Sequence, residues 1–261
     1  MSGQPEAILS VERIAVRFGG LVAISDMTFD VRNGEIVGLI GPNGAGKTTA
    51  FNVITGFQRP SSGEVRYRSR AVTGMKPHEI AKLGLVRTFQ RTSVFQQRSV
   101  FQNVLTGLHC SGRSGLWDTM LQSSREKTCE RELENAAHEI LGFVGLEQRA
   151  GEQAGALPYG EQRLVGIALA LAAKPTTLLL DEPVSGMNHS ETARAIKLIE
   201  KISASGMTIL LVEHDMQMVM QVCSRIVVLN YGRIIAEGTP AEIQNNPEVI
   251  RAYLGQGKKR A

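Results

Sequence analysis

A phosphate-binding pattern lies at residues 41–49 of the sequence. Gly41-Pro42-Asn43-Gly44-Ala45-Gly46-Lys47-Thr48-Thr49 fits G-x-x-x-x-G-K-[ST], and it follows the apolar run 36–40. A strand, a glycine-rich turn and a helix in this order can surround an anion with backbone N–H groups, and the helix N-terminus adds positive potential. We expect Lys47 to reach terminal phosphates and the Thr48 hydroxyl to bind Mg²⁺. The alternative is a glycine-rich turn that binds nothing.

Two adjacent carboxylates follow a second predicted buried strand. The apolar residues 177–180 lead into Asp181 and Glu182, and another apolar strand at 207–212 is followed by His214. Acids at the carboxyl edge of a buried strand are unfavourable unless a cation faces them, and this edge is where ligands bind in a doubly wound sheet. The alternatives are a solvated strand end for the acids and a structural role for the histidine.

Two further side chains stand at the ends of predicted strands. Phe18 closes a strand expected at 8–18, where it is either a core residue or an aromatic platform for an adenine ring. Gln90 ends a short strand expected at 85–89, where a glutamine usually makes hydrogen bonds within a loop. Neither residue decides the function, and a phosphate loop by itself does not separate kinases, GTPases and transport ATPases.

Composition limits the class of protein. The chain has 261 residues, of which 43% are hydrophobic and 5% aromatic, and this favours a parallel sheet covered by helices. The net charge of +4 is modest for a nucleic-acid binder. The 3 separated cysteines, the absence of a long apolar run and the lack of a signal pattern predict a soluble intracellular protein. Any membrane contact is then expected through a partner.

Hydrophobic periodicity predicts the elements that position these residues. Alternation of apolar and polar residues predicts half-exposed strands at 8–18 and 25–31. Residues 91–155 lack strand patterns and have helical spacing of apolar residues at 135–144, which predicts a mostly helical insert. The other expected elements are strands at 64–67, 225–229 and 233–237, and helices at 77–83, 135–144, 164–173, 190–202, 240–245 and 247–254.

Five motifs in a fixed order resemble the nucleotide-binding subunit of ABC transporters over essentially the whole chain. They are the phosphate loop, Gln90, the segment Leu157-Pro158-Tyr159-Gly160-Glu161-Gln162-Arg163, the Asp181-Glu182 pair and His214. The chain looks most like the branched-chain amino-acid uptake type, because of residues 17–21, 87–90, 157–163 and 251–255.

The resemblance implies a role for each motif residue. Phe18 stacks on adenine, residues 41–49 bind the phosphates, and a set of oxygen ligands holds Mg²⁺, namely Thr48, Gln90 and Asp181. Glu182 polarises the attacking water and His214 lies near the γ-phosphate. The signature loop contacts ATP bound by the opposite subunit and consists of Leu157, Pro158, Tyr159, Gly160 and Glu161.

The resemblance also implies the fold. We predict an α/β protein with a P-loop NTPase core, whose mostly parallel sheet is flanked by helices, together with an N-terminal antiparallel β-subdomain and a helical insert. The expected organisation is one ATPase domain over 1–261, with a core at 7–90 and 156–240, a helical subdomain at 91–155 and a C-terminal helical extension at 241–261.

The predicted function is the ATP-binding and ATP-hydrolysing motor subunit of an ABC transporter that imports branched-chain amino acids or related amides. ATP and Mg²⁺ are the expected cofactors. The expected partners are a second ATPase subunit in a homo- or heterodimer, membrane permease subunits and, indirectly, a substrate-binding protein, with the chain on the inner face of the cell membrane. The alternatives are export, lipid or lipopolysaccharide trafficking, and a soluble ABC ATPase that acts on nucleic acid.

Two residues depart from the family pattern. Pro158 stands where the signature usually has serine, and Asn188 stands where the loop at 185–188, which crosses the dimer interface, usually ends in aspartate. The hypothesis is that either change weakens this chain's half of a composite site, as would suit a heterodimer.

Overall fold

The structure is a computed structural model that describes residues 7–88, 94–111 and 124–254. The chain divides into two compact units. Unit 1 contains residues 1–87, 176–185 and 199–261, and unit 2 contains residues 88–175 and 186–198. The predicted domain limits, including the helical subdomain at 91–155, stay a prediction.

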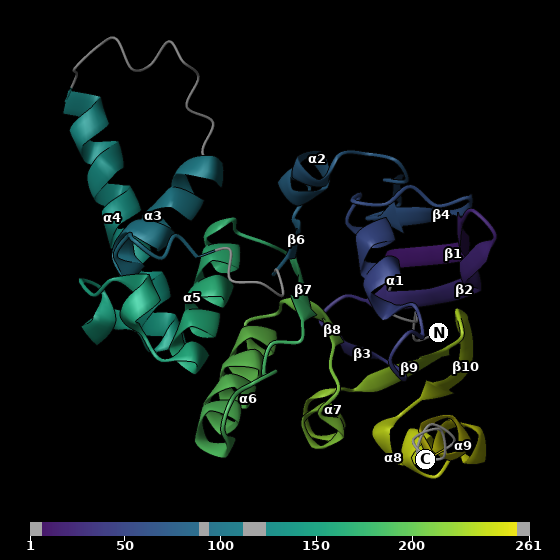
Figure 1. Cartoon of the computed structure of the whole chain (residues 1–261). Coiled ribbons are helices and arrows are strands. Elements are labelled where there is room, and N and C mark those ends of the chain that lie inside the picture. Colours follow the sequence, from purple (N-terminus) through teal and green to yellow (C-terminus); the bar gives the residue numbers. More distant parts are fainter. Residues whose placement is uncertain (1–6, 89–93, 112–123, 255–261) are drawn as a thin grey trace, which may run out of the picture. The chain divides into compact units, whose positions relative to one another are not determined.

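Unit 1 is built on a single sheet (Figure 1). Among the described residues, 10 strands pair in the order β5-β4-β1-β2-β10-β9-β3-β8-β7-β6. Their bounds are β1 (Ala7–Phe18), β2 (Leu21–Arg32), β3 (Ile36–Ile40), β4 (Ser62–Tyr67), β5 (Arg70–Ala71), β6 (Leu85–Arg87), β7 (Thr177–Asp181), β8 (Thr208–Val212), β9 (Arg225–Asn230) and β10 (Arg233–Gly238).

The sheet has a parallel part and an antiparallel part, as predicted. Strands β6, β7, β8, β3 and β9 pair in parallel, whereas β1 pairs antiparallel with β2 and β4. The two parts join where β10 meets β2 through Arg233 and Asp26. Every residue of β3, β7 and β8 is buried, as expected for strands covered on both faces.

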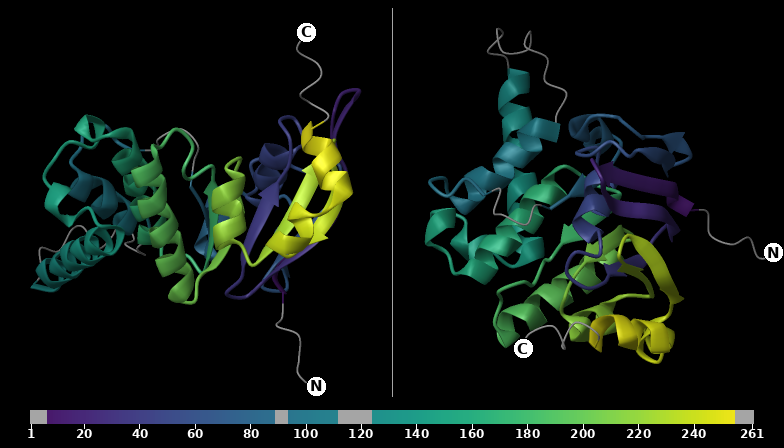
Figure 2. Two further views of the ribbon diagram at one scale, coloured as in Figure 1. Left: turned by 90° about the horizontal axis from the view of Figure 1, so that it is seen from below. Right: turned by 45° about the vertical axis from the view of Figure 1, so that its right-hand side comes forward.

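Five helices of the described residues belong wholly to unit 1: α1 (Lys47–Ile54), α2 (Pro77–Lys82), α7 (Met216–Val222), α8 (Pro240–Gln244) and α9 (Pro247–Leu254). Helix α1 contacts β2, and Phe51 on α1 is fully buried in the hydrophobic core with side chains of the sheet. Helices α8 and α9 contact β10, and their yellow ribbons lie beside that strand in Figure 2. The elements predicted between 225 and 254 are therefore confirmed.

Unit 2 is helical in its described residues. It contains α3 (Val100–Ser111), α4 (Ser124–Val144) and α5 (Tyr159–Ala172), two short 3₁₀ turns at Glu147–Arg149 and Ala154–Ala156, and the start of α6 (His189–Ala204), which ends in unit 1. Helix α3 contacts α4 and α5, and Gly107 permits the close approach to α5, since a Cβ there would lie 2.9 Å from the Ala172 Cβ. The predicted helical insert is present.

No helix in the described part of the sequence is both long and apolar enough to span a membrane.

An ion cluster at the amino ends of two neighbouring parallel strands joins β9 to the segment before β3. Arg225 donates from Nε to Oε1 of Glu35 at 2.8 Å and from Nη2 to Oε2 at 2.8 Å, and it also contacts Glu237. The side chains of Arg225 and Glu35 are each 14% exposed. Burial by itself raises the pKa of Glu35, but hydrogen bonds from Arg225 and the Arg32 backbone outweigh it and hold the pKa below its usual 4.5.

We expect Arg225→Met to lower the free energy of unfolding at neutral pH by about 2 kcal/mol, because it leaves a largely buried carboxylate without its cation. Since the pKa of Glu35 is lowered by folding, this stabilisation is present above pH 4.5 and is lost as the pH falls below that value. Urea unfolding of wild type and variant at neutral and acidic pH measures both effects. Arg66→Met is the control. It removes the exposed ion pair of Arg66 with Glu64 and should change the free energy of unfolding by less than about 1 kcal/mol. An Arg225→Met loss that is equal at both pH values would contradict the assignment.

Candidate functional site

The phosphate loop connects β3 to α1 and has a backbone that only glycine accommodates at two positions. Gly41 has a φ of 152°, and a Cβ there would lie 1.9 Å from the Leu229 carbonyl oxygen. Gly46 has a φ of 108°, and a Cβ there would lie 2.9 Å from the Ala23 carbonyl oxygen. Helix α1 begins without a capping hydrogen bond from the Gly46 position, so the amide groups of its first turn remain for another acceptor. The loop is therefore shaped to bind an anion at the helix N-terminus.

The other loop residues divide between buried and accessible positions. Pro42 and Ala45 are buried, whereas Asn43, Gly44 and Thr48 are exposed. Thr49 is half-buried in the first turn of α1. The buried residues anchor the loop against the sheet, and the accessible ones leave its backbone and the Thr48 hydroxyl open to a ligand.

Lys47 is buried, with 6% of its surface exposed. Its Nζ donates to the carbonyl oxygens of Gly41 at 2.6 Å and Pro42 at 3.0 Å. Burial lowers the pKa of Lys47, and the carboxylates of Glu182 and Asp181 act against that shift. The ammonium group is thus held inside the phosphate loop and within the electrostatic reach of both acids.

Asp181 ends β7 and is held by an arginine that the sequence analysis did not assign as its partner. The Asp181 side chain is 1% exposed, and Arg87 on the neighbouring strand β6 donates to its Oδ2 at 2.6 Å. Arg87 also donates to Oδ1 of Asn52 at 2.7 Å and lies 5.4 Å from the centroid of the Phe51 ring. Arg87 is thus a cation that faces Asp181, as expected for a buried acid, and an arginine in the short strand predicted at 85–89 is the signal that could have identified it.

Glu182 and His214 lie together at the carboxyl edge of the sheet. Oε1 of Glu182 is 2.8 Å from Nε2 of His214. Glu182 has a φ of 48°, a left-handed conformation that is strained for a residue with a side chain, and its N–H donates to the Val212 carbonyl at 2.8 Å. The strained turn aims the carboxylate toward the histidine rather than along the strand.

Phe18 is not a core residue. It lies at the end of β1 with 49% of its surface exposed, because the strand runs past the hydrophobic core before the turn at Gly19. The aromatic-platform role predicted for it stays a prediction. Gln90 lies outside the described residues.

The signature segment opens α5 in unit 2. Leu157 is buried, and Pro158 is the N-cap residue, with φ of −52° and ψ of 149° and no capping bond from its ring. The Tyr159 hydroxyl accepts hydrogen bonds from Arg163 Nε at 3.0 Å and Nη2 at 2.7 Å, and the guanidinium lies 5.2 Å from the ring centroid. These contacts direct the Tyr159 hydroxyl toward Arg163, and 45% of the surface of Tyr159 is exposed.

Gly160 and Glu161 complete that segment. A Cβ on Gly160 would lie 2.6 Å from Cδ of Glu191, so glycine permits close packing of the α5 N-terminus against the start of α6. Glu161 lies between two cations, with Arg149 Nε at 3.5 Å and Arg194 Nη1 at 3.7 Å. These contacts hold the first turn of α5 within unit 2.

Asn188 caps α6. Its Oδ1 accepts from the backbone N–H groups of Ser190 at 3.0 Å and Glu191 at 3.1 Å, while its own N–H donates to Oε2 of Glu191 at 2.9 Å. Asparagine and aspartate perform this capping equally well, so the local structure does not depend on which is present. The effect of Asn188 on a composite site stays a prediction.

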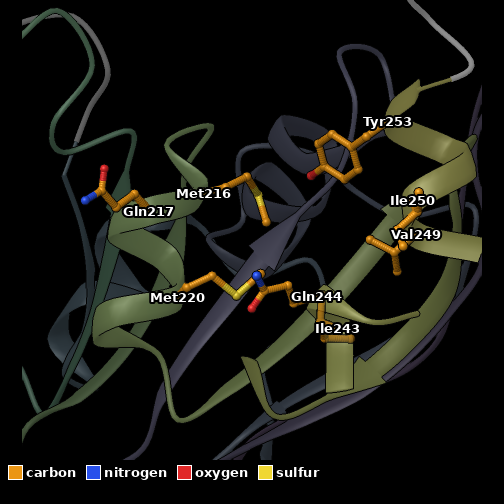
Figure 3. A pocket seen from close by; sticks show the side chains of 8 residues that line it. All are labelled: Met216, Gln217, Met220, Ile243, Gln244, Val249, Ile250 and Tyr253. Atoms are coloured by element: carbon orange, nitrogen blue, oxygen red, sulfur yellow. The ribbon is translucent and has the colours of Figure 1, made fainter. Parts of the chain in front are cut away.

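A separate cavity of about 440 Å³ lies in unit 1 between α7, α8 and α9. Figure 3 shows side chains from α7 facing those from α8 and α9 across it, and its lining residues are Met216, Gln217, Met220, Ile243, Gln244, Val249, Ile250 and Tyr253. Burial raises the pKa of Tyr253 to about 12, with the Gly41 backbone amide acting against that shift. None of the predicted nucleotide-binding residues lines this cavity.

The comparisons with known proteins agree with this geometry. The family model described as "ABC transporter" matches residues 24–185. The high-affinity branched-chain amino acid transport ATP-binding protein LivG of Escherichia coli is 42% identical over 96% of this chain and 99% of its own length. BraF of Pseudomonas aeruginosa, with the same description, is 41% identical over 95% of this chain and 98% of its own length.

The chain belongs to the ABC transporter family. A crystal structure of a nucleotide-free ATP-binding cassette from an ABC transporter superposes with a TM-score of 0.83 at 32% identity, covering 95% of this chain and 99% of that one. The protein is therefore a nucleotide-binding ABC cassette, an ATPase whose hydrolysis of ATP is coupled to transport. A second family model, described as "Branched-chain amino acid ATP-binding cassette transporter", matches residues 233–259.

The donor set of the cassette suits Mg²⁺ bound together with nucleotide. Thr48 and Asp181 offer a hydroxyl and a carboxylate, the hard oxygen ligands that Mg²⁺ prefers. In the described ranges, no group of three or more His, Cys, Asp or Glu side chains converges to hold a metal ion.

We expect Arg87→Met to lower the free energy of unfolding by about 3–5 kcal/mol, because Asp181 is then buried without its cation. The double variant Arg87→Met/Asp181→Leu removes both charges and should recover most of the loss. Urea unfolding of the single and double variants measures this. A double variant as unstable as Arg87→Met would show that lost packing, rather than the unpaired carboxylate, is responsible.

Proposed function

We propose that this cassette drives the uptake of branched-chain amino acids or related hydrophobic amides. The observation that carries the proposal is the near full-length identity of 42% to LivG, together with the match of the second family model to residues 233–259. ABC cassettes for export or for lipid trafficking have the same phosphate loop and acid pair, so the nucleotide site itself does not select the solute.

In the proposed mechanism the cassette's own residues bind ATP and orient water. The amide groups of the phosphate loop hold the phosphates, and Lys47 neutralises charge on the terminal ones. Glu182 accepts a proton from the attacking water, while His214 orients the Glu182 carboxylate and lies near the γ-phosphate. Thr48, Asp181 and Gln90 would hold Mg²⁺, which would supply charge neutralisation on the phosphate oxygens. Exposed Phe18 stacks on the adenine ring.

The proposed partners are a second ATPase subunit and the membrane permeases. The signature residues of one cassette would contact ATP held by the other, so that nucleotide binding draws two cassettes together and hydrolysis releases them. Unit 2 presents the exposed Tyr159 in this segment, with its hydroxyl hydrogen-bonded to Arg163. The protein would act on the inner face of the cell membrane. A substrate-binding protein would deliver the solute to the permeases and would therefore be an indirect partner of the cassette.

The second ATPase subunit is proposed to be a different protein. Pro158 brings no hydroxyl group to the N-terminus of α5, and Asn188 brings no negative charge to the loop before α6. A partner with serine and aspartate at these places would complete the stronger of two composite sites. Purified cassette that hydrolyses ATP cooperatively by itself, at the rate of the full transporter, would argue against this pairing.

Variants of the site separate binding from hydrolysis. Assayed together with the partner ATPase subunit, Glu182→Gln is expected to bind ATP normally, to hydrolyse it at least about 10²-fold more slowly and to accumulate as an ATP-bound heterodimer. Lys47→Ala should instead weaken ATP binding, because the cationic group beside the phosphate loop is lost. Calorimetry with MgATP, phosphate release and size-exclusion chromatography measure these effects. Hydrolysis by Glu182→Gln at the wild-type rate would remove Glu182 from the role of base.

A transport assay tests the solute. Cells that lack this gene should take up less labelled leucine, isoleucine and valine, and the wild-type gene should restore uptake while the gene with Glu182→Gln does not. Uptake of a charged amino acid is the matched control and should stay unchanged. Normal leucine, isoleucine and valine uptake without the gene would overturn the assigned solute and leave the ATPase assignment intact.

A further inference from the structure

Glu213 is a buried carboxylate to which the proposed mechanism gives no role. It directly follows β8, precedes His214 and is 2% exposed. Its Oε1 accepts from the Val184 N–H at 2.9 Å, and its Oε2 accepts from the His214 N–H at 2.8 Å and, more weakly, from the Asp215 N–H at 3.4 Å. Both carboxylate oxygens of Glu213 therefore accept hydrogen bonds, and the donors belong to two different loops.

The two loops are the ones that carry the reacting pair of side chains. Val184 lies two residues after Glu182 on the loop that follows β7, and His214 begins the loop that follows β8. The backbone pairing of β7 with β8 ends at Asp181 and Val212, and the N–H of Glu182 then bonds to Val212. Beyond that point the Glu213 carboxylate connects the two loops.

The three amide donors around Glu213 suit a side chain with two acceptor oxygens. Burial raises the pKa of Glu213, and the hydrogen bonds from the three backbone amides act against that shift. A glutamine has one acceptor oxygen, and its NH₂ group cannot accept from an amide. The substitution would leave either the Val184 or the His214 N–H facing another donor, which is unfavourable in a buried site.

We propose that Glu213 is a positioning residue that sets the separation of Glu182 and His214 by bridging the two loops. The inference rests on the proposed roles of those two side chains. Glu213 does not contact the reacting atoms. It acts by keeping Oε1 of Glu182 and Nε2 of His214 at their observed 2.8 Å while nucleotide is bound.

The first test compares turnover with affinity. Glu213→Gln should lower kcat for ATP hydrolysis about 10- to 100-fold, because small displacements of a reacting group have effects of this size, while Kd for ATP changes less than about 2-fold. Glu213→Asp, which keeps the charge but is one methylene shorter, should restore activity only in part. Glu35→Gln, a carboxylate change in the ion cluster of the same unit, is the control, and it should lower the unfolding midpoint without lowering kcat at a temperature where it is folded.

The second test is a double variant. If Glu213 acts through Glu182, then Glu213→Gln should add less than about 2-fold to the loss already caused by Glu182→Gln, measured in single-turnover hydrolysis. A full multiplication of the two effects would overturn the positioning role, and so would a Glu213→Gln loss that appears in Kd instead of kcat. A Glu213→Gln variant with wild-type kcat overturns this inference alone, whereas wild-type hydrolysis by Glu182→Gln overturns the proposed base.

Discussion

The nucleotide site of this cassette depends on how buried charges are balanced at the carboxyl edge of the parallel strands. An ammonium and a carboxylate each lose several kcal/mol of hydration when they are buried, so neither is tolerated without partners. Here Lys47 donates to loop carbonyls, Asp181 pairs with Arg87, and Glu213 accepts from backbone amides. The edge is thus a set of charges held in fixed places by a sheet whose central strands are completely buried.

The loops at this edge have strained or glycine-dependent backbones. Gly41 and Gly46 let the phosphate loop pass close to neighbouring carbonyls, and Glu182 takes a left-handed conformation that directs its side chain to His214. Such conformations persist only where the surroundings over-determine them. The backbone bond from Glu182 to Val212 and the carboxylate of Glu213 provide that support from β8.

The signature segment of unit 2 is held by side-chain contacts that all lie within unit 2. Arg163 stacks on Tyr159 one helical turn away, Glu161 lies between two arginines, and Asn188 caps the next helix. The geometry of this segment is therefore a property of unit 2 alone.

The amino-acid sequence by itself determined the features that depend on neighbouring residues. The phosphate loop, the buried strands before Asp181 and His214, the α/β fold and the helical insert follow from glycine positions and hydrophobic periodicity, which act over a few residues. The family, and with it ATP hydrolysis, followed from the order of such motifs. Only the tertiary structure decided which side chains meet. Arg87 pairs with Asp181 across 94 residues and Glu213 with Val184 across 29, because strand pairing places them together. Phe18 is exposed for the same reason, since burial depends on where the strand ends relative to the core.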